Sequence, residues 1–220
     1  MKHRLLLLIF SLIFSSCADE SITSEFVGIE TQQIDSTEYD LIKSEFSYFD
    51  VRRASEYLGG LSPEFKFAYT FALCGNDSIN YCRDSEWANK GMMCGCKNLV
   101  VKNTEGFSTI SSRSEFKEVF APIESRGEAL SYAIAMSGNF PVFDKEYFKD
   151  EYRYYNGIPG TTVVQEFDDY YLVQLFDYKA FGCDHPYYSV LIRVDKDGNI
   201  SEHRRKAVFE DPEDDGLCRD

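Results

Sequence analysis

The chain has 220 residues, and its 37 acidic side chains outnumber 23 basic ones, which gives a formal net charge of −14 at pH 7. Nucleic acid and anionic lipid headgroups repel such a chain, so a charged partner is expected to be cationic, for example a basic protein or Ca²⁺. The one basic cluster, His203-Arg204-Arg205-Lys206, is followed by the acidic run 210–215, and no nucleic-acid partner is expected. The alternative is that the acidity only keeps the protein soluble.

The N-terminus carries the pattern of an export signal. Lys2 and Arg4 precede the apolar run 5–14, and Ser15-Ser16 lead to Cys17. A membrane-spanning helix needs roughly 20 apolar residues, so the shorter run here predicts that residues 1–16 are a removable signal peptide. Its removal takes Lys2 and Arg4 away, and the mature net charge changes from −14 to −16.

The residues before Cys17 resemble the lipobox of bacterial lipoproteins, and Ala18-Asp19-Glu20 resembles the export signal of surface lipoproteins in Bacteroidota-type bacteria. The resemblance implies that Cys17 is lipidated and that this lipid holds the protein at a membrane. It also implies a location in the cell envelope, at the outer membrane, on its periplasmic face or at the cell surface. An ordinary secretory signal followed by a chance cysteine is the alternative.

The first half of the mature chain predicts a tether and then a small α+β region. Residues 17–38 are polar and acidic, which favours a flexible tether. Within the cysteine-containing region 39–122, the apolar spacing of residues 40–58 favours a helix that ends at Gly59-Gly60. Strands are expected at 65–73 and 97–102, followed by a turn at 103–106 and a short helix that starts at Ser112 or Ser114 and runs to Phe120.

Region 123–220 predicts one main helix and a four-stranded antiparallel sheet. Ser125 and Glu128 form a capping box, and the apolar stripe that follows consists of Ala129, Leu130, Ala133 and Ile134. Two hairpins come next, 161–167 with 170–178 and 187–194 with 199–209. The predicted fold is α+β, an antiparallel meander packed on one main helix and stapled by disulfides. This region either stands alone or forms one domain with 39–122.

Six cysteines remain after Cys17, and an even number in an exported chain predicts disulfides. Fifteen pairings are possible, but proximity favours two bridges among the first four and a third between the last two. A Cys94–Cys96 bridge is disfavoured because so short a loop strains the bond. The paired Cys-x₂-Cys of a zinc site is absent, so no metal and no cofactor are expected. The six are Cys74, Cys82, Cys94, Cys96, Cys183 and Cys218.

Catalytic and calcium motifs have weak support. Residues 195–199 look like the start of a calcium loop, but an EF-hand needs Gly at position six and Glu at position twelve, where Ile200 and Lys206 stand. A hairpin turn explains these residues better, and a solvated tail explains 210–215 better than a Ca²⁺ site. No Gly-x-Ser-x-Gly elbow is present. His185, next to Asp184, and His203 are the only histidines left for a hydrolase, and His185 is expected to be a solvated loop residue. No catalytic residue is therefore predicted.

Tyrosines are the best candidates for a binding surface, because each offers apolar area and a polar tip. Packing within the sheet is the alternative for any one of them. The candidates are Tyr152, Tyr154, Tyr155, Tyr170, Tyr171 and Tyr187.

The order of helix, hairpin and final strand in residues 125–209, with the turn Val194-Asp-Lys-Asp-Gly-Asn-Ile200, resembles PepSY-like and cystatin-like domains. The resemblance implies a non-catalytic role in which the protein binds or inhibits a partner. Three hypotheses follow: an uncharacterised envelope lipoprotein that binds a protein or a glycan, an acidic inhibitor or immunity-type protein that neutralises a basic toxin or hydrolase, and a hydrolase that uses His185 or His203.

Overall fold

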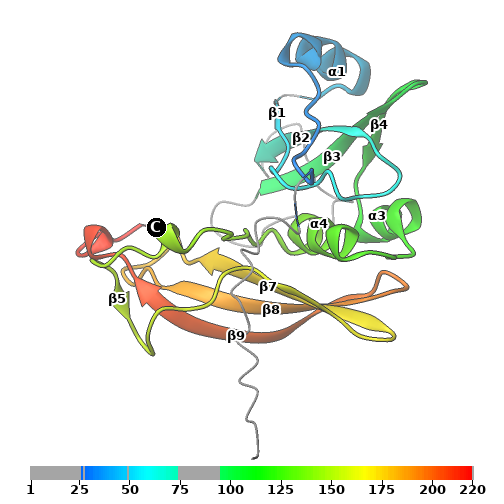
Figure 1. Ribbon diagram of the computed structural model, residues 1–220. Coiled ribbons are helices and arrows are strands. Elements are labelled where there is room, and N and C mark those ends of the chain that lie inside the picture. Colours follow the sequence, from blue (N-terminus) through cyan, green and yellow to red (C-terminus); the bar gives the residue numbers. More distant parts are fainter. Residues whose placement is uncertain (1–25, 27, 49, 74–94, 220) are drawn as a thin grey trace, which may run out of the picture.

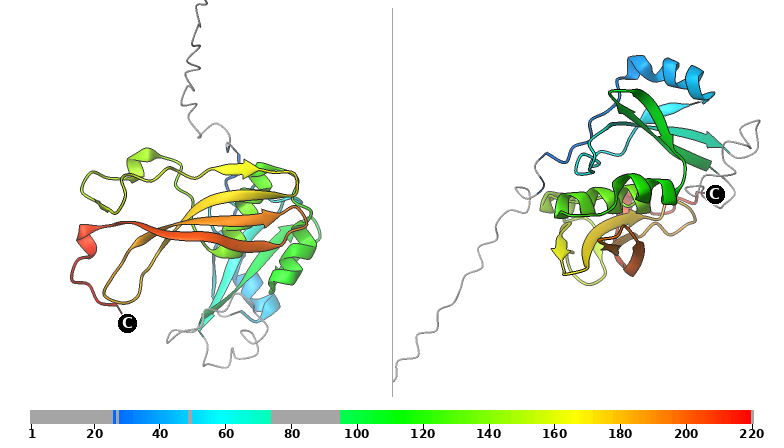
Figure 2. Two further views of the ribbon diagram at one scale, coloured as in Figure 1. Left: turned by 90° about the horizontal axis from the view of Figure 1, so that it is seen from below. Right: turned by 90° about the vertical axis from the view of Figure 1, so that its right-hand side faces the viewer.

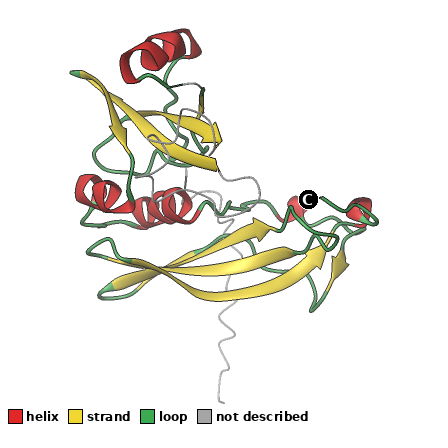
Figure 3. Ribbon diagram, turned by 180° about the vertical axis from the view of Figure 1, so that it is seen from behind, coloured by secondary structure: helices red, strands yellow, loops and turns green. Residues whose placement is uncertain are grey.

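The structure, a computed structural model, describes residues 26, 28–48, 50–73 and 95–219, and for residues 71–73, 95 and 96 the backbone alone. The fold is α+β, as predicted, with two antiparallel sheets. Helices α3 (Arg113–Phe120) and α4 (Arg126–Ser137) lie between the two sheets, as Figures 1 and 3 show from opposite sides. No helix in these described ranges has both the length and the apolar character needed to cross a membrane.

The first sheet has four strands in sequence order. They are β1 (Val51–Arg53), β2 (Lys66–Leu73), β3 (Gly95–Asn103) and β4 (Gly106–Ile110). The two predicted strands are β2 and β3, and the predicted turn at 103–106 joins β3 to a strand that was not expected. Both of these pairings are antiparallel, with Ala68 opposite Val100 and Leu99 opposite Ile110.

The helix expected over residues 40–58 is wrong for its second half. Helix α1 (Tyr39–Phe46) ends at Ser47, whose left-handed backbone (φ 58°) turns the chain. Val51 then enters β1 and pairs with β2. Burial decides this outcome, because Ile42 of α1 and Val51 of β1 both join a small cluster on the sheet with Ala68 and Val100.

The flexible tether expected at 17–38 is also wrong in the part that the structure describes. Ile34 is 1% exposed, and Gln33 forms a parallel bridge to Phe67 of β2. The hydroxyl of Thr31 accepts a hydrogen bond from the backbone N–H of Leu58 at 2.6 Å, and the amide of Gln33 bonds both the N–H and the C=O of Ala54. The polar side chains that suggested a solvated segment thus complete the backbone hydrogen bonds of a neighbouring one. Residues 17–25 lie outside the described residues.

Helix α4 begins at the predicted cap Ser125, and α3 begins at Ser112, one of the two starts that the sequence offered. The hydroxyls of Ser112 and Ser125 accept hydrogen bonds from the N–H groups of Glu115 and Glu128, and both carboxylates bond back, so each helix has a complete capping box. The C-cap of α4 is Gly138, with φ 73°. Eight consecutive residues of α4, 129–136, are buried, where one apolar stripe was expected. The reason is the layering, because a helix between two sheets has little surface left for solvent.

Gly60 makes the close packing of α4 possible. A Cβ atom at this position would lie 2.4 Å from the carbonyl oxygen of Gly127, near the start of α4. The N–H of Gly60 donates to the hydroxyl of Ser131 at 3.1 Å. The Gly59-Gly60 pair, expected to end a helix, instead lets two backbones approach closely.

The second sheet contains both predicted hairpins. Its strands are β5 (Arg153–Tyr154), β6 (Val164–Glu166), β7 (Tyr170–Tyr178), β8 (Tyr187–Asp195) and β9 (Ile200–Glu210), in the order β5-β9-β8-β7-β6. It has five strands rather than the expected four, because the short strand β5 pairs with the end of β9. Residues 195–199 form the expected turn, with Gly198 at φ 86°.

One continuous core joins the three layers. Phe67 and Leu99 of the first sheet, Phe116 and Leu130 of the helices, and Val190 of the second sheet belong to the same cluster of buried side chains. Figure 2 (right) shows the same order of sheet, helices and sheet from the side. A separate aromatic cluster, with Phe148, Phe176 and Phe209 at its centre, lies beyond the helices at the end of the second sheet where β5 pairs with β9.

Candidate functional site

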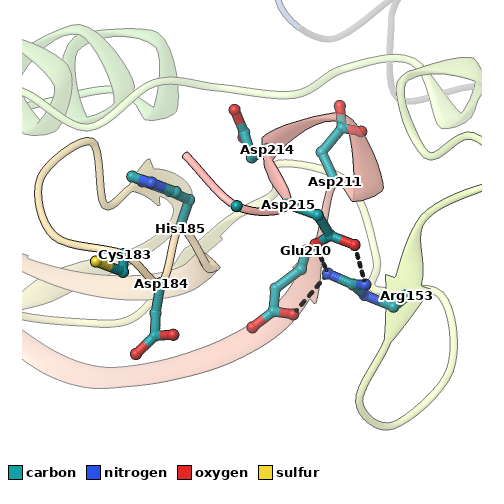
Figure 4. A pocket seen from close by; sticks show the side chains of 9 residues that line it. Arg153, Cys183, Asp184, His185, Glu210, Asp211, Asp214 and Asp215 are labelled. Carbon is teal, nitrogen blue, oxygen red and sulfur yellow. Dashed lines mark hydrogen bonds and ion pairs between the residues drawn. The ribbon is translucent and has the colours of Figure 1, made fainter. Parts of the chain in front are cut away.

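A small polar pocket of about 140 Å³ lies at the end of the second sheet where β5, the last residues of β9 and the C-terminal tail meet. The loop 179–186, which connects β7 to β8, forms another wall. Figure 4 shows the lining side chains, and we call this site the acidic pocket. Its lining residues are Arg153, Cys183, Asp184, His185, Glu210, Asp211, Asp214, Asp215 and Gly216.

The C-terminal tail forms one wall because it is fixed to the loop 179–186. Cys183 and Cys218 are joined by a disulfide, as predicted. Next to it, Gly182 and Arg219 exchange two backbone hydrogen bonds of 2.8 and 3.0 Å. The solvated tail expected at 210–215 is wrong, since Pro212–Asp214 form a short 3₁₀ helix that starts with the Asp211 carboxylate accepting from the N–H of Glu213 at 3.0 Å.

His185 is buried, with 4% of its surface exposed, so the expectation of a solvated loop histidine is wrong. Its Nδ1 lies 3.0 Å from the carbonyl oxygen of Lys179, and its Nε2 lies 2.9 Å from that of Leu217. Figure 4 shows the carboxylate of Asp184 directed away from the imidazole. Both ring nitrogens are thus engaged by the main chain, which is a structural role rather than the geometry of a general base.

The charges of the pocket are mostly negative. Five carboxylates line it, but only one guanidinium does, that of Arg153. Arg153 donates to Asp215 from two nitrogens, one of them at 2.7 Å, and to Glu210 at 3.2 Å. These hydrogen bonds lower the pKa of Asp215 and raise that of Arg153. Arg219, outside the lining, pairs with Asp214 at 3.3 Å.

Asp184 has no ion pair among the residues that the structure describes, and its side chain is exposed at the rim of the pocket. Tyr155 stands at the same edge of the sheet, 49% exposed, and its hydroxyl donates to Glu210. That hydrogen bond is the main cause that raises the pKa of Tyr155 to about 12. The site therefore offers an excess of carboxylates with one tyrosine beside them.

The six candidate tyrosines do not form one surface. Tyr152, Tyr154 and Tyr187 surround Phe209, with ring centroids 4.9, 5.7 and 4.4 Å from it, and belong to the aromatic cluster. Burial is the main cause that raises the pKa of Tyr187. Of the six, only Tyr155 bonds to a residue that lines the acidic pocket.

The other two tyrosines lie at the opposite end of β7 from the pocket. Tyr171 is fully buried in the main core. Tyr170 stacks on Phe167 at 4.6 Å and under the guanidinium of Arg193 at 3.9 Å. Neighbouring strand residues face opposite sides, so a tyrosine-rich sequence does not produce a tyrosine-rich face.

Within the described part of the chain, no three His, Cys, Asp or Glu side chains are placed to hold a metal ion. Three of the six predicted disulfide cysteines, Cys74, Cys82 and Cys94, lie outside the described residues, as does Cys17. The side chain of Cys96 is likewise not described. The basic cluster lies on β9, where Arg205 pairs with Asp177 and Glu202, and His203 is exposed.

Sequence reasoning singled out the acidic run and the last two cysteines but missed Arg153 at the centre of the charges. Arg153 is the one basic residue of the stretch 150–155. A lone arginine in such a stretch is a weak sequence signal for an ion pair with acidic residues elsewhere in the chain.

Comparison with protein-family models found no match. Comparisons with curated proteins and with solved structures found no significant match either. The resemblance of residues 125–209 to PepSY-like and cystatin-like domains therefore stays a prediction.

Proposed function

We propose that the protein is a non-catalytic lipoprotein of the cell envelope that binds a protein partner by accepting a cationic side chain in the acidic pocket. The observation that carries the proposal is the excess of five carboxylates over one guanidinium around a single pocket. A lysine or arginine side chain that enters would pair with carboxylates that Arg153 leaves unpaired. The net charge of −16 expected for the mature chain would speed its approach.

The size of the pocket favours a protein side chain over a glycan. Sites for small-molecule ligands typically enclose about 300–1,000 Å³, whereas this pocket encloses about 140 Å³. That volume suits the end of one side chain but not a sugar ring with its neighbours. The exposed Tyr155 supplies apolar area with a polar tip at the rim, as in many protein interfaces.

The predicted lipid on Cys17 would place this pocket outside the cytoplasm, where the disulfide Cys183–Cys218 can persist. An inhibitor or immunity-type role is the form of the proposal in which the cationic partner is a basic toxin or hydrolase. The structural role of His185 speaks against a hydrolase that uses this residue.

The test uses the mature chain and two probes, a fluorescent oligo-lysine and an oligo-arginine peptide, with an uncharged peptide of equal length as reference. We expect the cationic peptides to bind and salt to weaken them. The pocket variant Asp184→Asn/Asp211→Asn removes two lining carboxylates that Arg153 does not bind and should lose roughly threefold to thirtyfold in affinity, the range for two surface ion pairs.

The matched control is Glu56→Gln/Glu118→Gln, which removes the same charge from exposed positions outside the pocket. We expect it to keep nearly full affinity, measured by fluorescence anisotropy. Equal losses in the two variants would show that the peptides respond only to net charge and would contradict the proposal, as would a complete lack of binding.

A further inference from the structure

The two hydrogen bonds of His185 need two donors. Carbonyl oxygens only accept, and both ring nitrogens face one, at 3.0 Å from Lys179 and 2.9 Å from Leu217. A neutral imidazole carries a single N–H, whereas the imidazolium carries two. Only the protonated ring can therefore satisfy both carbonyl groups.

These two carbonyl groups belong to different segments. Lys179 begins the loop between β7 and β8, and Leu217 belongs to the C-terminal tail, so the buried ring joins the tail to the loop. We propose that His185 is a pH-dependent latch, closed when the ring is protonated and loosened when it is neutral. The latch concerns residues 211–219 and does not depend on what the acidic pocket binds.

The surroundings of the ring are mostly acidic. The Tyr178 ring lies 6.1 Å away and roughly parallel, and its hydroxyl donates to Asp214. The titratable and charged groups that face the latch from β7, the loop, β5, β9 and the tail are Tyr178, Lys179, Asp184, Arg153, Glu210, Asp211, Asp214, Asp215 and Arg219.

Deprotonation removes one of the two bonds. The neutral ring keeps one N–H, and the lone pair of its other nitrogen then faces a carbonyl oxygen, which is repulsive. The protonated state stabilises the closed tail, so this stabilisation is complete at low pH and is lost as the pH rises through the titration of the ring. The disulfide Cys183–Cys218 keeps the tail attached throughout, so opening is local and reversible.

Two amide groups report on the latch. The N–H groups of Gly182 and Arg219 bond each other's carbonyl oxygens beside the disulfide. Their hydrogen-exchange protection factors, corrected for the intrinsic pH dependence of exchange, measure tail closure. The amide of Val190, buried in the middle of β8, serves as internal reference.

The experiment follows the ¹⁵N shifts of the His185 ring and these protection factors from pH 5 to pH 9 in the mature, oxidised protein. We expect both ring nitrogens to be protonated at low pH. As the ring loses its proton, protection at Gly182 and Arg219 should fall roughly tenfold to hundredfold, as expected for one lost charge-assisted hydrogen bond, while protection at Val190 stays constant.

Two variants complete the design. His185→Gln should abolish the pH dependence of protection, and His203→Gln, which changes an exposed histidine, should preserve it. The proposal is overturned if the His185 ring does not change protonation between pH 5 and pH 9, if it titrates without any loss of protection, or if His185→Gln keeps the pH dependence. The first two outcomes use the unmodified protein, so the test does not depend on the folding of a variant.

Discussion

Replacing Cys183 and Cys218 together by serine is expected to lower the free energy of unfolding by about 3–4 kcal/mol. The bridge closes a loop of 35 residues in sequence, and its loss gives the unfolded chain the freedom that the closed loop removes. The folded state also changes, because the wall of the acidic pocket formed by the tail is then held only by hydrogen bonds such as those between Gly182 and Arg219.

Urea unfolding of the double variant and the parent protein, both with the other cysteines left in place, measures this effect. The double variant also tests the pocket, since we expect it to bind the cationic peptides more weakly than the parent. An unchanged free energy of unfolding together with unchanged protection of the Gly182 amide would contradict the prediction, because it would mean that the tail needs no covalent staple.

Phe116→Ala is expected to cost about 3–5 kcal/mol, the range for removing a fully buried phenylalanine ring. Phe116 is 0% exposed and lies on α3 between the sheets. Its ring centroid is 4.6 Å from that of Phe120 and 5.1 Å from that of Tyr132 on α4. The cavity left by alanine would open in the layer that both sheets share.

Val119→Ala is the matched control on the same helix, because Val119 is 36% exposed and should cost much less. Circular dichroism and tyrosine fluorescence should report one common unfolding transition for Phe116→Ala, since one core joins both sheets. Two separate transitions, one for each sheet, would show that regions 39–122 and 123–220 fold independently.

The elements that sequence reasoning predicted correctly are those with local signals. The capping box at Ser125, and the helix start that was expected at Ser112 or Ser114, need only residues within one helical turn. The hairpins of β6 with β7 and of β8 with β9 need only an alternating pattern and a partner strand nearby in sequence. The disulfide between Cys183 and Cys218 could be predicted because the other four cysteines lie close together in sequence and were expected to pair among themselves.

The errors have a common physical cause, which is that burial by distant segments overrides local pattern. Residues 28–38 look solvated, but Thr31 and Gln33 serve the backbone of residues 54–58. The segment after α1 has helical spacing, but pairing with β2 draws it into a strand. The sequence of helix α4 shows one apolar stripe, but Ser131, which lies off that stripe, is also buried and accepts a hydrogen bond from Gly60.

The candidate site was half predictable. The bridge between Cys183 and Cys218 was predicted correctly, whereas the acidic run 210–215 was expected to be solvated; both help to form the acidic pocket. The place of Arg153 depends on the pairing of β5 with the end of β9, and two-residue strands leave no readable pattern. The burial of His185 depends on the carbonyl group of Leu217, which lies 32 residues away in sequence, and no local pattern reveals that contact.

Mass spectrometry of the protein purified from its native host tests the central claim most directly, namely that the chain is exported, anchored and stapled. The account predicts a mature product that begins at Cys17, carries acyl chains on that residue, and yields a peptide pair linked through Cys183 and Cys218. An intact Met1, or free thiols at positions 183 and 218, would contradict it.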